Sequence, residues 1–84
     1  MAPEFTLRMI YPIIDMEATG NNIRHLRIEK GVSVKELSQF LGLSERAIYK
    51  WQRGETLPSI DSLLALSLYL NALIEELLVY RNTI

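Results

Sequence analysis

Apolar side chains recur every three or four residues between residues 33 and 54, a spacing that places them on one side of each of two short helices. The positions are Val34, Leu37, Phe40, Leu41, Leu43, Ile48 and Trp51. Few residues separate the two predicted helices, so their apolar sides are expected to face each other across a tight turn. The pattern therefore predicts a helix-turn-helix.

The first of these helices is bounded by residues with clear capping chemistry. Ser33 is expected to cap a helix that runs through Leu41, because its hydroxyl can accept a hydrogen bond from a free backbone amide. Glu36 is expected to reach back to the Ser33 amide, which completes a capping box. Gly42 follows where a left-handed turn favours a residue without a Cβ.

The second helix is expected at about Glu45–Arg53, with Ser44 as its cap and Gly54 at its end. Its side opposite the apolar residues is polar and partly cationic, with Glu45, Arg46, Tyr49 and Lys50. In helix-turn-helix proteins this side enters the major groove of DNA, which is roughly 12 Å wide and admits a helix. An ordinary solvated surface explains the same composition, so the pattern alone leaves both interpretations open.

A longer set of residues, reaching past these two helices, carries a family resemblance. The set is Leu37-Ser38, Leu41-Gly42-Leu43-Ser44, Ile48, Trp51, Arg53-Gly54, Pro58-Ser59, Leu63-Leu64, Leu66 and Leu77-Leu78. These residues resemble the Cro/C1-type (XRE) helix-turn-helix family, the fold of small phage repressors, over about residues 19–80. The resemblance implies an all-α, five-helix lambda-repressor-like DNA-binding domain with a central helix-turn-helix.

The resemblance also implies which residues contact DNA. It identifies the second motif helix as the recognition helix and gives base-reading roles to Glu45, Arg46 and Lys50, with Tyr49 beside them. It places Ser44 and Arg53 at phosphate-contacting positions.

The chain departs from the family pattern at two positions of the first motif helix. Val34 stands where many members carry a glutamine that supports the DNA contact, and that contact is therefore not expected here. Ser38 replaces the usual alanine where the two motif helices cross, and serine is small enough to keep the crossing close.

The charge of the chain is concentrated in the part that would face DNA. The formal net charge is −1, which by itself argues against binding to phosphates. Residues 21–53, however, contain seven Lys and Arg against three Glu, a balance of +4, while residues 1–20 contribute −2 and residues 54–84 contribute −3. This distribution favours a nucleic-acid-binding face on the motif.

The start of the chain is expected to be an extended arm over residues 1–14. Residues 1–8 have no helical period and precede a second methionine, Met9, so they are either a vector-derived leader or native chain. Residues 10–14 are rich in β-forming side chains but are broken by Pro12, and they are expected to pack on the core or on a partner subunit. The domain itself is expected at residues 15–84, with Asp15 as the cap of its first helix and Gly31 at that helix's end.

Two further helices are expected after the motif. Ser59 is expected to cap a fourth helix that is apolar almost all round, and Asn71 to end it. A fifth helix is expected through Leu77, Leu78 and Tyr80. Leu68 and Leu73 stand where family members usually place polar residues, so they are expected to form a dimer interface, although leucine-rich segments also belong to cores.

Several classes of function are disfavoured by the composition. The chain has no cysteine, and one histidine, His25, cannot build a metal site or a catalytic triad, so no metal or cofactor is expected. No apolar run approaches the ~20 residues of a membrane span, which favours a cytoplasmic protein. No constellation of nucleophile, base and acid is present, so an enzyme is not expected.

Two functions remain. The first is a sequence-specific DNA-binding transcriptional regulator of repressor type, which binds a palindromic operator on double-stranded DNA as a homodimer through residues 45–53. The second is a protein-interaction module, such as an antitoxin or adaptor, which holds a protein partner with its apolar fourth and fifth helices.

Overall fold

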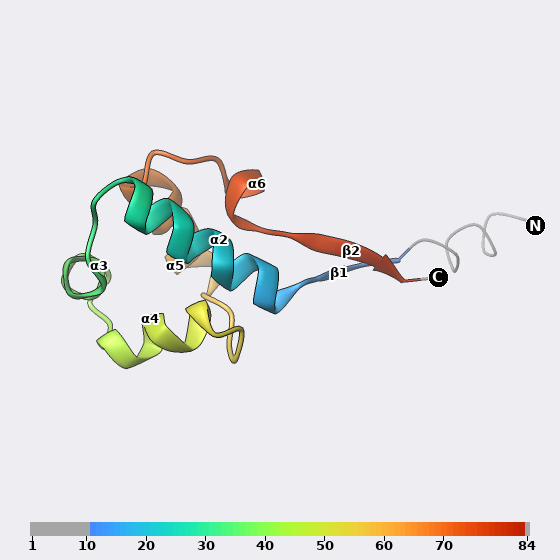
Figure 1. Ribbon diagram of the computed structural model, residues 1–84, viewed down its shortest axis with the longest axis horizontal. Helices are drawn as coiled ribbons and strands as arrows, with labels where there is room; N and C mark the ends of the chain where they lie inside the picture. The colour runs from blue at the N-terminus through green and yellow to red at the C-terminus, as the bar shows by residue number, and fades with distance from the viewer. Residues whose placement is uncertain (1–10, 84) are drawn as a thin grey trace, which may run out of the picture.

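The computed structural model describes residues 11–83, in which five helices form a body and two strands form a ribbon that projects from it (Figure 1). The helices are α2 (Met16–Glu29), α3 (Val34–Leu41), α4 (Glu45–Gln52), α5 (Ile60–Tyr69) and α6 (Ile74–Leu77), and the strands are β1 (Tyr11–Ile14) and β2 (Tyr80–Thr83). The predicted five-helix domain is therefore confirmed, with a small sheet added. Residues 1–8, for which a leader or native chain was expected, lie outside the described residues.

Each of the four longer helices begins at a predicted side-chain cap. The cap oxygens accept hydrogen bonds from the backbone amide three residues on, at 3.0 to 3.2 Å, in Asp15, Ser33, Ser44 and Ser59. The Glu36 carboxylate accepts a hydrogen bond from the Tyr69 hydroxyl on α5 in place of the predicted bond from the Ser33 amide. Half of the predicted capping box is thus replaced by a contact between α3 and α5.

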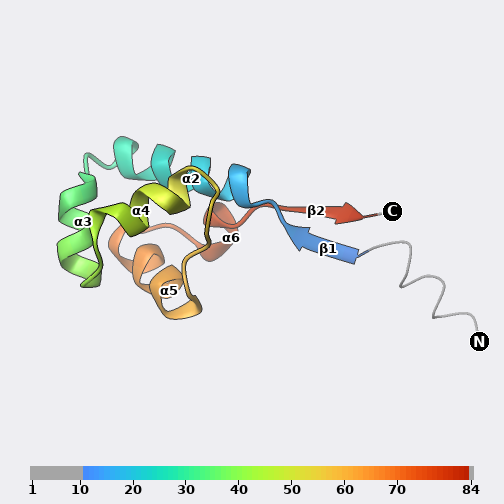
Figure 2. The ribbon, with the colours of Figure 1, turned by 90° about the horizontal axis from the view of Figure 1, so that it is seen from below.

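The core of the body is a single cluster of buried apolar side chains drawn from α2, α3, α4, α5 and α6. Its fully buried members are Ile23, Leu37, Ile48, Leu66, Leu70 and Leu77. Trp51 is 5% exposed, as predicted for the single tryptophan. Viewed from the α4 side, α2 lies along one side of the body and α5 along the other (Figure 2).

Gly20 has a packing role in α2 that could not be predicted from its low helix propensity. Glycine is a poor helix former, yet α2 continues through Gly20 from Met16. A Cβ at this position would lie 2.1 Å from the Trp51 carbonyl oxygen and 2.9 Å from that of Gln52. The absence of a side chain therefore lets α2 and the end of α4 approach closely.

The end of the chain differs from the prediction. The fifth helix was expected to continue through Tyr80, but α6 ends at Leu77 and residues 80–83 form β2, which pairs antiparallel with β1. The register pairs Ile14 with Tyr80 and Ile13 with Arg81. The all-α expectation did not include this sheet, because the partner of β1 lies at the other end of the chain.

Two apolar residues of the motif are more exposed than predicted. Phe40 is 50% exposed and Leu43 is 38% exposed, although both were expected between the motif helices. Leu37 and Leu41, four residues apart, occupy the inner side of α3, and Phe40 is turned about 100° away from Leu41. Phe40 instead stacks on Tyr69 of α5, with ring centroids 4.2 Å apart.

Candidate nucleic-acid interface

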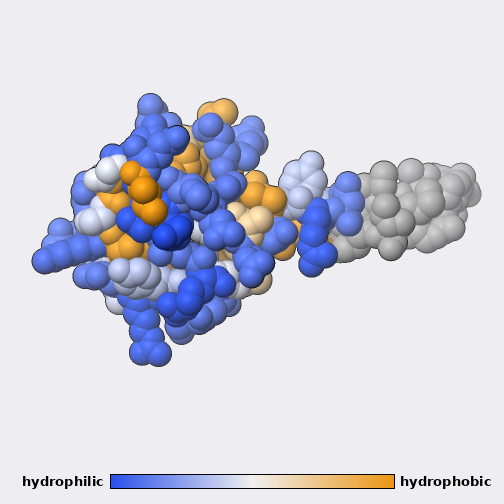
Figure 3. Space-filling model, in the orientation of Figure 1, coloured by the Kyte–Doolittle hydropathy of each residue, from blue (hydrophilic) through white to orange (hydrophobic). Residues whose placement is uncertain are grey.

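Helix α4 presents the predicted polar side chains on the surface of the body. Ile48 and Trp51 face the core, and on the other side Glu45, Arg46 and Tyr49 are exposed. Lys50 is half-buried. The side of the molecule on which α4 lies is mainly hydrophilic (Figure 3). The arrangement leaves the polar side of the first two turns of α4 exposed.

The start of α4 is shaped by its cap. The Ser44 hydroxyl accepts the Ala47 amide at 3.2 Å, so its first structural role is to begin the helix. Ser44 is also exposed, and a hydroxyl that accepts one hydrogen bond can still donate its own proton. Its position at the N-terminus of α4 is suited to an anionic phosphate oxygen, because the helix dipole favours negative charge there.

The end of α4 carries an ion pair that sequence analysis did not predict. Arg53 Nε lies 2.5 Å from Glu55 Oε2, and both side chains are about half exposed. This hydrogen bond lowers the pKa of the Glu55 carboxyl and raises that of Arg53, and the charges of Lys50 and Arg46 lower the pKa of Glu55 further. Glu55 therefore lies near three cations, of which Arg53 is the one that forms the ion pair.

Arg27 belongs to the framework behind the interface. In the structure its Nε donates to Gln52 Oε1 at 3.0 Å and its Nη1 donates to the Val32 carbonyl at 2.9 Å. One half-buried side chain thus ties the end of α2 to the last residue of α4 and to the loop before α3. The sequence contained no local signal for this pairing, because residues 27 and 52 are far apart in the chain.

The two departures from the family pattern both fit the packing. Val34 is 5% exposed and belongs to the core. The Ser38 side chain is nearly buried, and its hydroxyl donates to the Lys35 carbonyl at 2.8 Å, so no polar atom is left without a partner where the motif helices cross.

A second surface feature lies on α5. The predicted interface residues Leu68 and Leu73 are 80% and 64% exposed. Ile60 and Leu64 are exposed as well, at 79% and 50%, although the sequence did not lead us to place either in an interface. The signal was present in their spacing, because residues 60, 64 and 68 lie on one side of a helix. We call Ile60, Leu64 and Leu68 the α5 stripe.

Sites for other chemistry are not found in the part of the chain that the structure describes. No group of three or more His, Cys, Asp or Glu side chains within residues 11–83 could hold a metal ion. His25 is exposed on α2. No helix in the same range is long and apolar enough to cross a membrane.

Residues 23–77 match the family model described as helix-turn-helix. The chain belongs to this helix-turn-helix family. The predicted resemblance to its Cro/C1-type (XRE) members is confirmed, and the match includes the whole of α3, the turn and α4.

Known proteins with the same motif include regulators from several sources. An HTH-type transcriptional regulatory protein of Thermococcus kodakarensis is 43% identical over 42 residues, which are 50% of this chain and 13% of that protein. The restriction-modification controller protein C.AhdI of Aeromonas hydrophila is similar in structure, with a TM-score of 0.69 and 30% identity over 75% of this chain and 96% of that one. The biofilm regulator SinR, solved in complex with DNA, has a TM-score of 0.64 and 30% identity over 70% of this chain and 95% of that one.

Proposed function

We propose that the protein is a sequence-specific DNA-binding transcriptional regulator of repressor type, which binds a palindromic operator as a homodimer. The observation that carries this proposal is the surface of α4. Its first two turns expose Glu45, Arg46 and Tyr49, while Ile48 and Trp51 anchor the helix in the core. The family membership and the similarity to SinR, which has been solved with DNA, support the proposal.

The polar side chains of α4 fall into two proposed roles. Arg46 and Lys50 read base edges, where one bidentate contact to guanine contributes about 1–3 kcal/mol of discrimination. Glu45 suits an amino group of cytosine, and Tyr49 packs beside them. Ser44 and Arg53, at the two ends of α4, contact the phosphate backbone and position the helix.

The contact between Arg53 and phosphate requires a local exchange. Arg53 is paired with Glu55 in the free protein, and a carboxylate close to a phosphate is repelled. On DNA the Arg53 guanidinium would exchange Glu55 for a phosphate oxygen or bind both through different N–H groups. Either change is small, since both side chains are on the surface and no backbone needs to move.

The homodimer is proposed from the exposed leucines. Leu68 and Leu73 are large apolar side chains that a monomer leaves in water, and such patches mark contact surfaces. Leu68 is on α5 and Leu73 directly precedes α6, and α5 lies along the side of the body opposite α2 (Figure 2). A two-fold axis along that side can leave both α4 helices free for DNA. In such dimers the recognition helices contact half-sites about 34 Å apart, one turn of DNA.

Repression would act through occupancy. A bound dimer would exclude the polymerase or another protein from the operator. No step of this mechanism requires a cofactor or a chemical reaction, and no metal or cofactor is part of the proposal.

A protein-interaction module, such as an antitoxin or adaptor, is the second candidate. The exposure of the α5 stripe favours it, because three large apolar side chains in one row also suit a different protein. In that case the cationic surface of α4 would be secondary.

Selection of bound duplexes from a random DNA pool, followed by sequencing, separates these candidates. The proposed function predicts an enriched palindromic consensus. The Arg46→Ala variant should lose enrichment at defined positions of each half-site, whereas Arg24→Ala, a change at an exposed cation of α2, should leave the consensus unaltered. Absence of enrichment with the folded parent would refute sequence-specific binding and favour the interaction module.

A further inference from the structure

The ribbon formed by β1 and β2 is expected to pack against another apolar surface. It consists of two four-residue strands, and a two-stranded ribbon is marginally stable in water unless its apolar face is packed. Its base is fixed to the body: the Asp15 amide donates to the Val79 carbonyl at 2.8 Å, and the Val79 amide donates to the Thr19 hydroxyl at 2.9 Å. Beyond this base the ribbon extends away from the helices (Figures 1 and 2).

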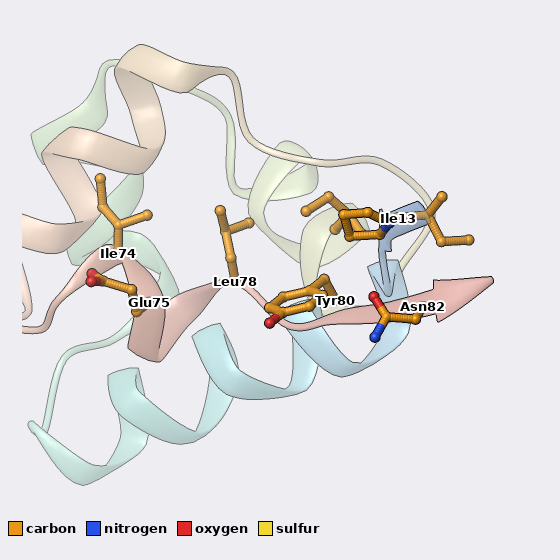
Figure 4. A pocket seen from close by; sticks show the side chains of 8 residues that line it. Ile13, Ile74, Glu75, Leu78, Tyr80 and Asn82 are labelled. Atoms are coloured by element: carbon orange, nitrogen blue, oxygen red, sulfur yellow. The ribbon is translucent and has the colours of Figure 1, made fainter. Parts of the chain in front are cut away.

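One face of the ribbon and the α6 region form an apolar groove, which we call the ribbon groove (Figure 4). The Ile14–Tyr80 and Pro12–Asn82 pairs lie on the same face of the ribbon, because side chains alternate along a strand. Ile74 and Leu78 continue this surface toward the body, and their side chains point away from α2. The groove has a volume of about 640 Å³, and Tyr80 in its wall is 63% exposed.

The ribbon groove and the α5 stripe differ in shape and lie in succession along the molecule. The stripe is a convex row on a helix, and the groove is concave. The α5 helix lies on the side of the body opposite α2 (Figure 2), and the stripe is on its solvent side, because Leu63 and Leu66 face the core. The groove is beside the ribbon, and the Ile74 and Leu78 side chains in its wall point away from α2 (Figure 4). A two-fold axis passing between them, across the long direction of the molecule, would bring the stripe of each copy to the groove of the other. The same operation keeps both α4 helices on one side of the pair.

The size of the stripe argues that it is not the whole interface. A stable interface covers about 800 Å² on each partner. Such an interface takes roughly 20–30 residues from each partner, whereas the stripe has three side chains. A second apolar surface is needed, and the ribbon groove supplies one.

Contact between the two ribbons themselves is less favourable. Pairing along the β1 edge is disfavoured by Pro12, which has no N–H to donate. Pairing of β2 with a second β2, centred on residue 81, would place two Arg81 side chains opposite each other, and like charges in that arrangement are destabilising.

We infer that, in the dimer, the α5 stripe of one copy packs into the ribbon groove of the second copy, and that this contact is made twice. The inference rests on the proposed homodimer and specifies its geometry. The ribbon is then an arm that grips the partner, and the anchoring of Val79 to α2 sets the angle of that arm relative to the body.

Chemical cross-linking tests the geometry, because the chain has no cysteine and each introduced thiol is unique. Leu64→Cys labels the stripe and Tyr80→Cys labels the groove, and the two variants carry tags of different mass. After mixing and subunit exchange, a short bis-maleimide should join Leu64→Cys to Tyr80→Cys about tenfold faster than it joins a control pair, since docked thiols have millimolar effective concentrations. The control pair is Leu64→Cys with Ile28→Cys, an exposed position on α2.

A second pair of variants covers the case in which cross-linking is hindered by side-chain geometry. Leu64→Glu and Tyr80→Glu should weaken self-association in sedimentation by similar factors, while Ile28→Glu should not. The fluorescence of the buried Trp51 verifies that each variant is folded.

The outcomes separate this inference from the proposed homodimer. A parent protein that sediments as a monomer overturns both. A dimeric parent in which Leu64→Cys joins only to itself, or in which Tyr80→Glu leaves the dimer intact while folded, keeps the homodimer and overturns the groove contact.

Discussion

Replacement of Gly20 by alanine tests whether the close approach of α2 and α4 positions the recognition helix. At an exposed helix position this change would stabilise the fold by about 0.8–1 kcal/mol, because alanine is the better helix former. Here the new Cβ would lie 2.1 Å from the Trp51 carbonyl oxygen, a backbone atom that cannot move without α4. Overpacking of this kind typically costs about 1–3 kcal/mol, and contact with backbone belongs at the upper end.

The net expectation is therefore a loss of about 1–2 kcal/mol for Gly20→Ala, after subtraction of the propensity gain. With a urea m-value of about 1 kcal/mol/M for so small a domain, the unfolding midpoint should fall by about 1–2 M. Trp51 fluorescence follows this transition directly, since its emission should be blue-shifted in the folded state and move to the red on unfolding. Operator binding should weaken as well, because α4 is displaced.

Asn21→Ala provides the matched control for this experiment. Asn21 is the next residue of α2 and is exposed, so alanine there adds helix propensity without a contact and should stabilise the protein by a few tenths of a kcal/mol. The expected result is a loss of stability in Gly20→Ala and a gain of stability in Asn21→Ala. If Gly20→Ala unfolds at the same urea concentration as the parent or a higher one, the close contact does not constrain α4.

Three further predictions concern the surface. Arg46→Ala should relax the base preference at particular operator positions. Arg53→Ala should instead weaken binding to operator and scrambled duplexes alike, and should reduce the slope of log affinity against log salt concentration by about one unit. Affinities measured at several salt concentrations distinguish the two variants. The double variant Leu68→Glu with Leu73→Glu should sediment as a folded monomer and bind the operator weakly, because bivalent docking is lost; unchanged sedimentation would contradict the interface. NMR titration should find the pKa of Glu55 below its usual value, and this pKa should return toward the usual value in Arg53→Ala. Because the pKa is lowered in the folded state, the ion pair contributes to folding stability above the unfolded-state pKa. That contribution is lost as the pH falls through the folded-state pKa.

Features that depend on neighbours within three or four residues could be predicted from the sequence. Asp15, Ser33, Ser44 and Ser59 each cap a helix through an amide three residues away, and Gly42 takes the left-handed conformation with φ 69°. Such bonds form wherever the local chain bends correctly, so residue type and spacing are sufficient to predict them. The motif and its exposed residues on α4 followed from the same local pattern.

Features that join distant parts of the chain became known only from the packed helices and strands. Tyr80 is in a strand because Ile14, sixty-six positions earlier, pairs with it, and no local pattern at residues 78–83 identifies that partner. In the same way Gly20 meets Trp51, and Arg27 meets Gln52, only after the helices have packed. A one-turn helix such as α6 has little stability of its own, so contacts across the molecule determine whether the chain after Leu77 continues as helix or pairs as strand.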